Sequence, residues 1–144
     1  MAKKAGTIPF QVIDGTFWIC LISSKKRKGK FVLPKGSVRS SERSREAAIR
    51  ETFEEAGLKG KISKKSVKIK AKSAGDDLSL NTNKFFPLKI TEISDHWPEQ
   101  KMRERLWVDL KNLPTSKMVK RDVLVVKSRR FKTIIENLMK TVAA

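Results

Sequence analysis

Two apolar runs rich in β-branched and aromatic residues open the chain, at residues 7–13 and 16–23. They flank Asp14-Gly15, a dipeptide typical of the two-residue turn in a β-hairpin. We therefore expect two antiparallel strands joined by a tight turn. A basic loop at 24–30 follows, and residues 30–33 are expected to form a short strand that leads into Pro34, Lys35 and Gly36.

Later segments predict more strands and then a helical tail. Residues 61–73, as one or two strands, and residues 85–94 are connected by a turn-rich stretch at 74–83. Pro87 favours an edge strand or a bulge. A loop at 95–103 leads to a strand at 105–110. Helices are predicted at 117–127 and at about 128–142, where apolar residues recur at helical spacing and are expected to pack on the sheet.

A helix in the middle of the chain places three carboxylates on one face. It is expected to start near Ser41 or Ser44, either of which is a suitable N-cap, and to run to about residue 56. At about 100° per residue, Glu51, Glu54 and Glu55 fall within an arc of roughly 100°. One face of this helix is therefore a cluster of glutamates, and the other packs inward.

Glutamates three and four residues apart repel one another unless a positive charge lies between them. Their hard oxygen ligands suit Mg²⁺ or Mn²⁺ better than zinc, and Mg²⁺ in proteins commonly binds substrate phosphates. A solvated acidic face is the alternative for an isolated run of this kind. The neighbouring Arg50 and the L-P-K-G turn at 33–36 favour a metal site instead.

The composition adds an extreme positive charge. The 144 residues include 33 Lys and Arg against 15 Asp and Glu, which gives +18 at pH 7. Such a basic protein is expected to meet a polyanion: nucleic acid, a phosphate-dense small molecule or an anionic membrane. The length suits a single domain, 1–144.

Targeting signals are not evident in the first residues. The opening six residues are short and basic and precede no apolar h-region, so neither a signal peptide nor a membrane span is predicted. Cys20 is the one cysteine, which rules out an intramolecular disulfide, and its apolar neighbours favour a buried thiol. These features lead us to expect a cytoplasmic protein.

The stretch 36–58 resembles the Nudix box, G-x5-E-x7-R-E-U-x-E-E-x-G-U, in which U is a bulky aliphatic residue. It departs from this pattern at the first U, where Thr52 offers only a methyl group, and it matches at Gly36, Glu42, Arg50, Glu51, Glu54, Glu55, Gly57 and Leu58. The resemblance implies an α/β Nudix fold, an α/β/α sandwich with a mixed β-sheet between helices.

Segments outside the box resemble the diphosphoinositol polyphosphate phosphohydrolase branch of the Nudix hydrolases and its bacterial members. They include D-x-W-P-E at 95–99 and R-x-W at 105–107, and the likeness runs from about residue 6 to residue 124. Bacterial members of this kind are also similar to dinucleoside polyphosphate hydrolases. The substrate expected from the resemblance is therefore an inositol pyrophosphate or a dinucleoside polyphosphate.

The resemblance also implies residue roles in hydrolysis of a diphosphate bond by water attack at phosphorus. Glu51, Glu54 and Glu55 would hold one or more Mg²⁺ ions, helped by the backbone carbonyl of Gly36. Arg50 would orient a glutamate through a charge-assisted hydrogen bond. Glu54, Glu55 and Arg50 are thus expected to be catalytic.

A general base often lies outside the box in such enzymes. We favour Glu104, three residues before Trp107 at the start of a strand, over Glu99. Glu92, Asp95 and the glutamates of the box are further candidates. Each of the residues outside the box has an alternative as a surface carboxylate.

The basic loop and the aromatic residues bear on the substrate. Lys28, Lys30 and Lys35 are expected to bind its phosphates, although a solvated hairpin tip is the alternative for the first two. Trp97 is a candidate for stacking on a base, while His96 is expected to face solvent. The chain has no tyrosine, which disfavours a dedicated adenine clamp.

Two other functions remain open at this point. The first is an RNA 5′-pyrophosphohydrolase, which would act on single-stranded RNA with a 5′-triphosphate. The second is a basic Nudix-fold module that binds RNA or DNA without hydrolysis, although an intact R-E-x-x-E-E is unnecessary for binding alone.

Overall fold

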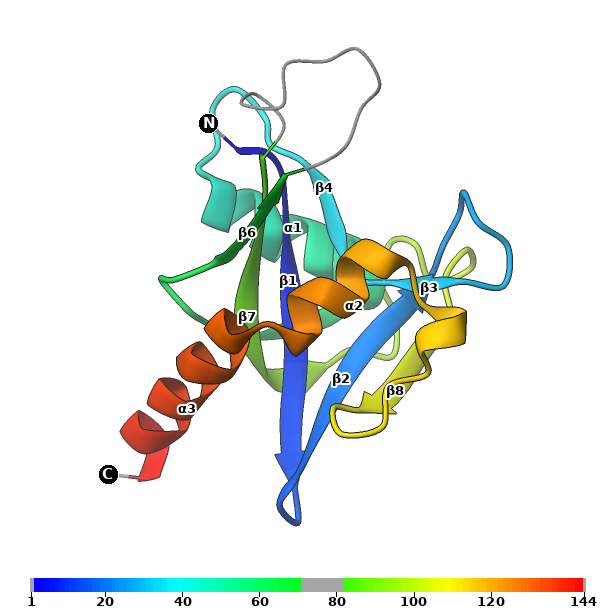
Figure 1. The fold of residues 1–144 in the computed structure, drawn as a ribbon. Coiled ribbons are helices and arrows are strands. Elements are labelled where there is room, and N and C mark those ends of the chain that lie inside the picture. The colour runs from blue at the N-terminus through cyan, green and yellow to red at the C-terminus, as the bar shows by residue number, and fades with distance from the viewer. Residues whose placement is uncertain (1, 71–81, 144) are drawn as a thin grey trace.

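The computed structural model describes residues 2–70 and 82–143, so most of the predicted connection at 74–83 lies outside the described residues. One sheet of eight strands organises them, in the order β3-β2-β1-β7-β5, with β4 paired to β1, β6 to β7 and β8 to β2. Figure 1 shows α1 behind this sheet and α2 and α3 in front of it. The predicted α/β/α sandwich with a mixed sheet is confirmed.

The opening hairpin forms as predicted. Strands β1 (Ala2–Ile13) and β2 (Thr16–Ser23) pair in antiparallel register, with Ile13 opposite Thr16. Asp14 and Gly15 both have positive φ, 50° and 80°. A turn with two such residues matches the twist of the flanking strands, which is why this dipeptide favours a hairpin.

The centre of the sheet is a parallel pair, β1 and β7 (Thr82–Ile93). Pro87 lies opposite Ile8 of β1, so the expectation of an edge strand or a bulge at Pro87 is wrong. On its other side Pro87 falls between the residues paired with β5 and those paired with β6, and its carbonyl accepts a hydrogen bond from the Ser63 N–H at 2.9 Å. The missing N–H of proline therefore removes no ladder bond at this position.

Short strands complete the sheet on both sides. Two strands, β5 (Leu58–Ile62) and β6 (Val67–Lys70), occupy the described part of the predicted strand region 61–73, and both are antiparallel to β7; residues 71–73 lie outside the described residues. Strands β3 (Phe31–Val32) and β8 (Arg105–Asp109) pair with β2, while β4 (Lys35–Ser37) pairs with β1. This last pairing brings Gly36 to the helix side of the sheet.

Helix α1 (Ser44–Ala56) carries the glutamates. Neither Ser41 nor Ser44 is its N-cap: the cap is Arg43, whose backbone N–H donates to Glu46 Oε1 at 3.0 Å. The helix ends at Gly57, which has the left-handed conformation that glycine adopts without strain, with φ at 67°.

The carboxyl-terminal helices cover the opposite face of the sheet. A 3₁₀ turn at Thr115–Lys117 precedes α2 (Lys120–Lys127), so the helix predicted at 117–127 starts later than expected. Helix α3 (Arg129–Ala143) matches the prediction, and Phe131, Ile134 and Ile135 bury its apolar side. Among the described residues, no helix combines the length and the apolar character needed to cross a bilayer.

Separate apolar clusters fill the two sides of the sheet. The larger one joins β1, β2 and β7 to α2 and α3, and smaller ones lie toward α1. Cys20 is buried in one of the smaller clusters, as predicted, and burial raises the pKa of its thiol to about 12. This cysteine is therefore an unreactive part of the core.

Candidate active site

Gly36 lies so close to the Glu51 side chain that no residue with a Cβ atom fits at position 36 without a shift. Strand β4 holds Gly36 against α1, and a Cβ atom placed on Gly36 would overlap the Glu51 carboxyl group. The glycine is needed here for space, because its backbone conformation is ordinary. The backbone of Gly36 and the Glu51 carboxylate are thus brought together from two elements of the fold.

Arg50 holds the other carboxylates of the site in place. It donates to both oxygens of Glu42, at 2.7 and 2.8 Å, and to Glu51 Oε1 at 2.6 Å. A longer contact of 3.5 Å joins it to Glu54 Oε2, and a 3.1 Å hydrogen bond joins it to the Ser37 carbonyl. The hydrogen bonds from Arg50 and from the Arg39 backbone lower the pKa of Glu42 to about 2. Arg50 therefore fixes one edge of the carboxylate cluster as an anion.

Glu55 lies on the inner side of the cluster and is only 7% exposed. Its carboxylate accepts hydrogen bonds from the Lys35 N–H at 2.9 Å and from Arg103 Nη2 at 3.1 Å. Burial raises the pKa of Glu55 to about 7, although the charge of Arg103 opposes the shift. Glu55 thus carries a desolvated carboxyl group that a cation would stabilise as an anion.

The donor atoms fit a hard divalent cation. Glu51, Glu54 and Glu55 and the carbonyl of Gly36 offer only oxygen, and they come from one helix and the strand packed against it. Across the described ranges, no three acidic, histidine or cysteine side chains converge tightly enough to mark a metal centre. The reason is visible in the contacts: Arg50 holds Glu51 and Glu54, while Arg103 and the Lys35 N–H hold Glu55.

A loop after β7 caps the carboxyl-terminal end of α1. Four consecutive carbonyls, of residues 54–57, accept hydrogen bonds of 2.9 to 3.2 Å from Glu99 N, Trp97 Nε1, Arg105 Nη1 and Ser94 N, respectively. Helix ends otherwise leave such groups without partners. This loop therefore fixes the turn of α1 that carries Glu54 and Glu55.

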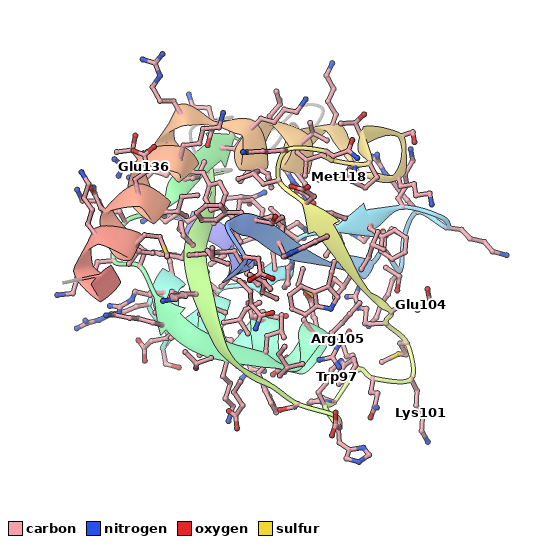
Figure 2. The ribbon with its side chains drawn as sticks, turned by 90° about the horizontal axis from the view of Figure 1, so that it is seen from below. Trp97, Lys101, Glu104, Arg105, Met118 and Glu136 are labelled. Carbon is pink, nitrogen blue, oxygen red and sulfur yellow. The ribbon has the colours of Figure 1, made fainter. Side chains whose placement is uncertain are left out.

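Trp97 is part of this cap. Its ring packs on Gly57, where a Cβ would come within 2.8 Å of the ring, and Arg105 lies 4.1 Å from the ring centroid on a cation–π contact. Figure 2 shows Trp97 and Arg105 side by side. These contacts give Trp97 a structural position beside α1. The motifs D-x-W-P-E and R-x-W thus meet in space.

The structure separates the candidates for the general base. Glu104 has an exposed side chain (Figure 2). Its backbone N–H donates to Ser23 Oγ at 2.9 Å. Glu99 instead accepts from Arg103 and from Lys25, at 3.1 and 2.9 Å, and so joins the network that holds Glu55. Burial opposes it, but the hydrogen bonds from Lys25 and Arg103 lower the pKa of Glu99. Glu92 is exposed on β7, opposite Lys59.

Arg103 is the residue of this site that sequence reasoning missed. Its side chain is only 8% exposed, and it bonds Glu55, Glu99 and the Ser23 carbonyl, the last at 2.8 Å. Its partners lie up to 80 residues away in the chain, so no local pattern points to it. The R-x-W motif starts two residues later, at Arg105, and is the nearest signal in the sequence.

A basic cavity of about 380 Å³ lies beside the carboxylates. Six cationic side chains line it: Lys4, Lys26, Arg27, Lys35, Lys120 and Arg121. A smaller adjoining cavity of about 210 Å³ shares Lys4, Lys26 and Lys35 and reaches Glu55 and Arg103. Burial, followed by the charges of Arg121 and Lys4, lowers the pKa of Lys35 to about 8.

The other two predicted phosphate ligands lie elsewhere. Lys28 and Lys30 line a separate cavity of about 510 Å³ on the other side of the basic loop. Lys30 also donates to the Ser116 carbonyl at 2.6 Å, which anchors the loop to the turn before α2. Of the three predicted lysines, Lys35 is thus the one that the fold brings to Glu55.

Known proteins with the same features define the family. The model of the NUDIX domain matches residues 6–128, so the chain belongs to the Nudix domain family. The chain is 38% identical over 108 residues to Nudix hydrolase 4 of Arabidopsis thaliana, and the aligned region covers 75% of the chain and 49% of that protein. It is 29% identical over 91 residues to diphosphoinositol polyphosphate phosphohydrolase 3-beta of Bos taurus, covering 62% of the chain and 53% of the relative. The chain thus spans about half the length of these curated relatives.

Solved structures show the same fold. The Ap4A hydrolase of C. elegans superposes with a TM-score of 0.60 at 17% identity, and the match covers 96% of each chain. At this identity the likeness concerns the fold. The Nudix family predicted from the box is confirmed.

Proposed function

We propose that this chain is a metal-dependent pyrophosphohydrolase that cleaves a diphosphate linkage in a phosphate-rich small molecule. The observation that carries the proposal is the junction of two features. Glu55 of the carboxylate cluster lines one end of a pair of adjoining cavities, and six cationic side chains line the larger of the two. Such a site has the parts that phosphoryl transfer requires, which are chiefly positioning and electrostatic stabilisation.

The proposed metal ligands are Glu51, Glu54, Glu55 and the carbonyl of Gly36, for Mg²⁺ or alternatively Mn²⁺. When bound, the ion would polarise the phosphate and lower the pKa of the attacking water. The roles of the surrounding protein follow from its contacts. Arg50 orients two of the glutamates, and the loop at 94–105 fixes the last turn of α1.

The proton acceptor is proposed among the glutamates outside the box. Glu99 is favoured by its place in the Arg103 network, which Glu55 shares, and the exposed Glu104 is the alternative. A comparison of Glu99→Gln with Glu104→Gln separates them. The variant that removes the base should lower kcat and abolish the acidic limb of its pH dependence, because that limb arises from protonation of the base, whereas loss of a surface carboxylate should change neither.

The cavity favours a densely phosphorylated substrate. Among the described residues that line it, none is aromatic, and Trp97 already contacts Arg105 and Gly57. Charge-assisted contacts to several phosphates are therefore available, while a stacking surface for a base is not provided there. An inositol pyrophosphate fits this cavity better than a dinucleoside polyphosphate, and the name of the 29% identical bovine relative points to the same class.

A phosphate-release assay tests the proposal. Purified protein with Mg²⁺ is given inositol pyrophosphates, diadenosine polyphosphates, nucleoside triphosphates and 5′-triphosphorylated RNA, each with and without a chelator. We expect turnover of the first class, its loss on chelation and its loss in Glu54→Gln. Glu136→Gln, which removes an exposed carboxylate on α3, is the matched control and should keep full activity. Retained turnover in Glu54→Gln would refute the assignment.

A further inference from the structure

The outer surface of α2 and α3 carries nearly all its charge with one sign. Between residues 111 and 140 the sequence has nine Lys or Arg and two acidic residues, Asp122 and Glu136. Asp122 is fully buried, where it accepts from the Leu33 N–H at 2.9 Å and pairs with Arg121. Glu136 is therefore the one acidic side chain that this segment exposes, and Figure 2 shows it on α3.

The fold turns the remaining cations outward. The apolar sides of α2 and α3 are buried against the sheet, and the two helices follow one another across the same face (Figure 1). This leaves an exposed group, which we name the helical basic face: Lys120, Lys127, Arg129, Arg130, Lys132 and Lys140. The turn between β5 and β6 extends it, because Arg130 Nε donates to the Ser66 carbonyl at 3.3 Å beside Lys64 and Lys65.

Glu136, four residues from both Lys132 and Lys140, is the acidic side chain exposed among these charges, and it forms no ion pair with them. The ion pairs among the described residues use Lys25, Arg50, Arg103 and Arg121 as their cations, so none involves the helical basic face. On the α1 side, by contrast, the Arg50 side chain bonds the carboxylates of Glu42 and Glu51. A surface on which like charges repel without compensation gains free energy when it meets an anion.

We propose that the helical basic face binds the phosphate backbone of a nucleic acid. The cations are spread over two helices and are all exposed, which suits a chain of regularly spaced phosphates better than one small anion. A membrane surface is the less suitable partner, because Phe131, Ile134 and Ile135 of α3 are buried in the core and Leu124 is the large apolar side chain that α2 exposes. The predicted contacts are to the backbone and so carry no sequence preference.

This surface is distinct from the proposed hydrolytic site. The sheet separates its residues from the glutamates of α1, and none of them is hydrogen-bonded to those glutamates. Lys120 is the member of the helical basic face that also lines the basic cavity. Nucleic-acid binding and hydrolysis of a diphosphate linkage in a small molecule can therefore be tested separately, and failure of one leaves the other standing.

Binding is measured by fluorescence anisotropy of a labelled single-stranded RNA of about 20 nucleotides and of a duplex DNA of about 20 base pairs. The KCl concentration is varied between about 50 and 300 mM, and EDTA is present to stop hydrolysis. The test variant is the quadruple K127Q/R129Q/K132Q/K140Q, and the control is K61Q/K68Q/K101Q/K111Q. Both remove four exposed charges, so the net charge falls equally. Glutamine is a good helix former, and unchanged circular dichroism shows that both variants fold.

We expect the slope of log K against log[KCl] to fall by about 3 in the test variant on single-stranded RNA, at about 0.7 for each lost contact. In the control it should stay within about 1 of the wild-type value. Hydrolysis of the small-molecule substrate should be unchanged in the test variant. Equal weakening in both variants, or no salt-dependent binding by the wild type, would overturn the proposal. So would tighter binding to phosphatidylserine vesicles than to either nucleic acid.

Discussion

Two buried hydroxyl groups join α1 to the central strand of the sheet. Thr7 of β1 and Thr52 of α1 are 0% and 1% exposed, and their Oγ1 atoms lie 2.6 Å apart. Thr52 is the position at which the box departs from a bulky aliphatic residue. The departure is therefore compensated by a partner 45 residues earlier in the chain. We predict that these two positions are strongly coupled in stability.

The magnitude follows from the burial of both groups. Thr52→Val leaves the Thr7 hydroxyl buried without its partner, which should cost about 1 to 3 kcal/mol. Thr7→Val should cost less, about 0.5 to 1.5 kcal/mol, because a helical threonine can turn its hydroxyl to the carbonyl four residues earlier. The double variant replaces both groups by methyls of the same shape, and we expect it to lie within about 1 kcal/mol of the wild type.

The assay is urea unfolding of the four proteins at one pH, followed by circular dichroism and tryptophan fluorescence. Coincident transitions by the two probes license the two-state free energies, and the cycle then gives the coupling. In thermal unfolding each kcal/mol should move Tm by roughly 2 to 4 °C for a domain near this size. A double variant whose loss equals the sum of the two single losses would refute the reasoning.

Three further predictions concern the carboxylate cluster and its supports. The pKa of Glu55 is raised to about 7 in the folded state from an ordinary value near 4.5. Between pH 4.5 and 7 the folded protein therefore holds a proton on Glu55 that the unfolded chain has lost, so the free energy of unfolding falls as pH rises through this window. Glu55→Gln should therefore unfold at higher urea than the wild type at pH 8 with EDTA, and nearly together with it at pH 4.5; an equal gain at both pH values would exclude this cause. Trp97→Phe keeps most of the ring but loses the hydrogen bond to the Glu55 carbonyl, and should cost about 1 kcal/mol in urea unfolding together with a lower kcat; an unchanged kcat would show that the cap does not position Glu55. Gly36→Ala should abolish turnover because its Cβ meets the Glu51 carboxyl group, whereas Gly29→Ala, where a Cβ meets open space, should keep turnover despite a positive φ; activity in Gly36→Ala would refute the close approach.

The contacts around α1 explain how a strongly basic chain keeps a cluster of acids. Arg50 and Arg103 approach the glutamates from opposite sides, one from the helix itself and one from the loop before β8. Each arginine also bonds a glutamate outside the cluster, Glu42 or Glu99. The carboxylates are thus oriented before any ligand arrives, which lowers the cost of ordering the site.

Local patterns in the sequence were sufficient for several elements. The Asp14-Gly15 turn, the helix stop at Gly57 and the amphipathic α3 depend on backbone preferences and spacing within a few residues, so they can be read without knowledge of the fold. The Nudix family could likewise be predicted from the box, because Glu51, Glu54 and Glu55 are three and four residues apart on one helix and their spacing is visible in the sequence.

Other features arise only when distant segments meet. The partner of Thr52, the capping of α1 by the loop around Trp97 and the hold of Arg103 on Glu55 join residues 42 to 48 positions apart. The placement of Pro87 in a central strand depends in the same way on where β5 ends and β6 begins. A pattern along the chain records which residues can form an element, but a hydrogen bond between two elements depends on their packing, which the fold as a whole determines.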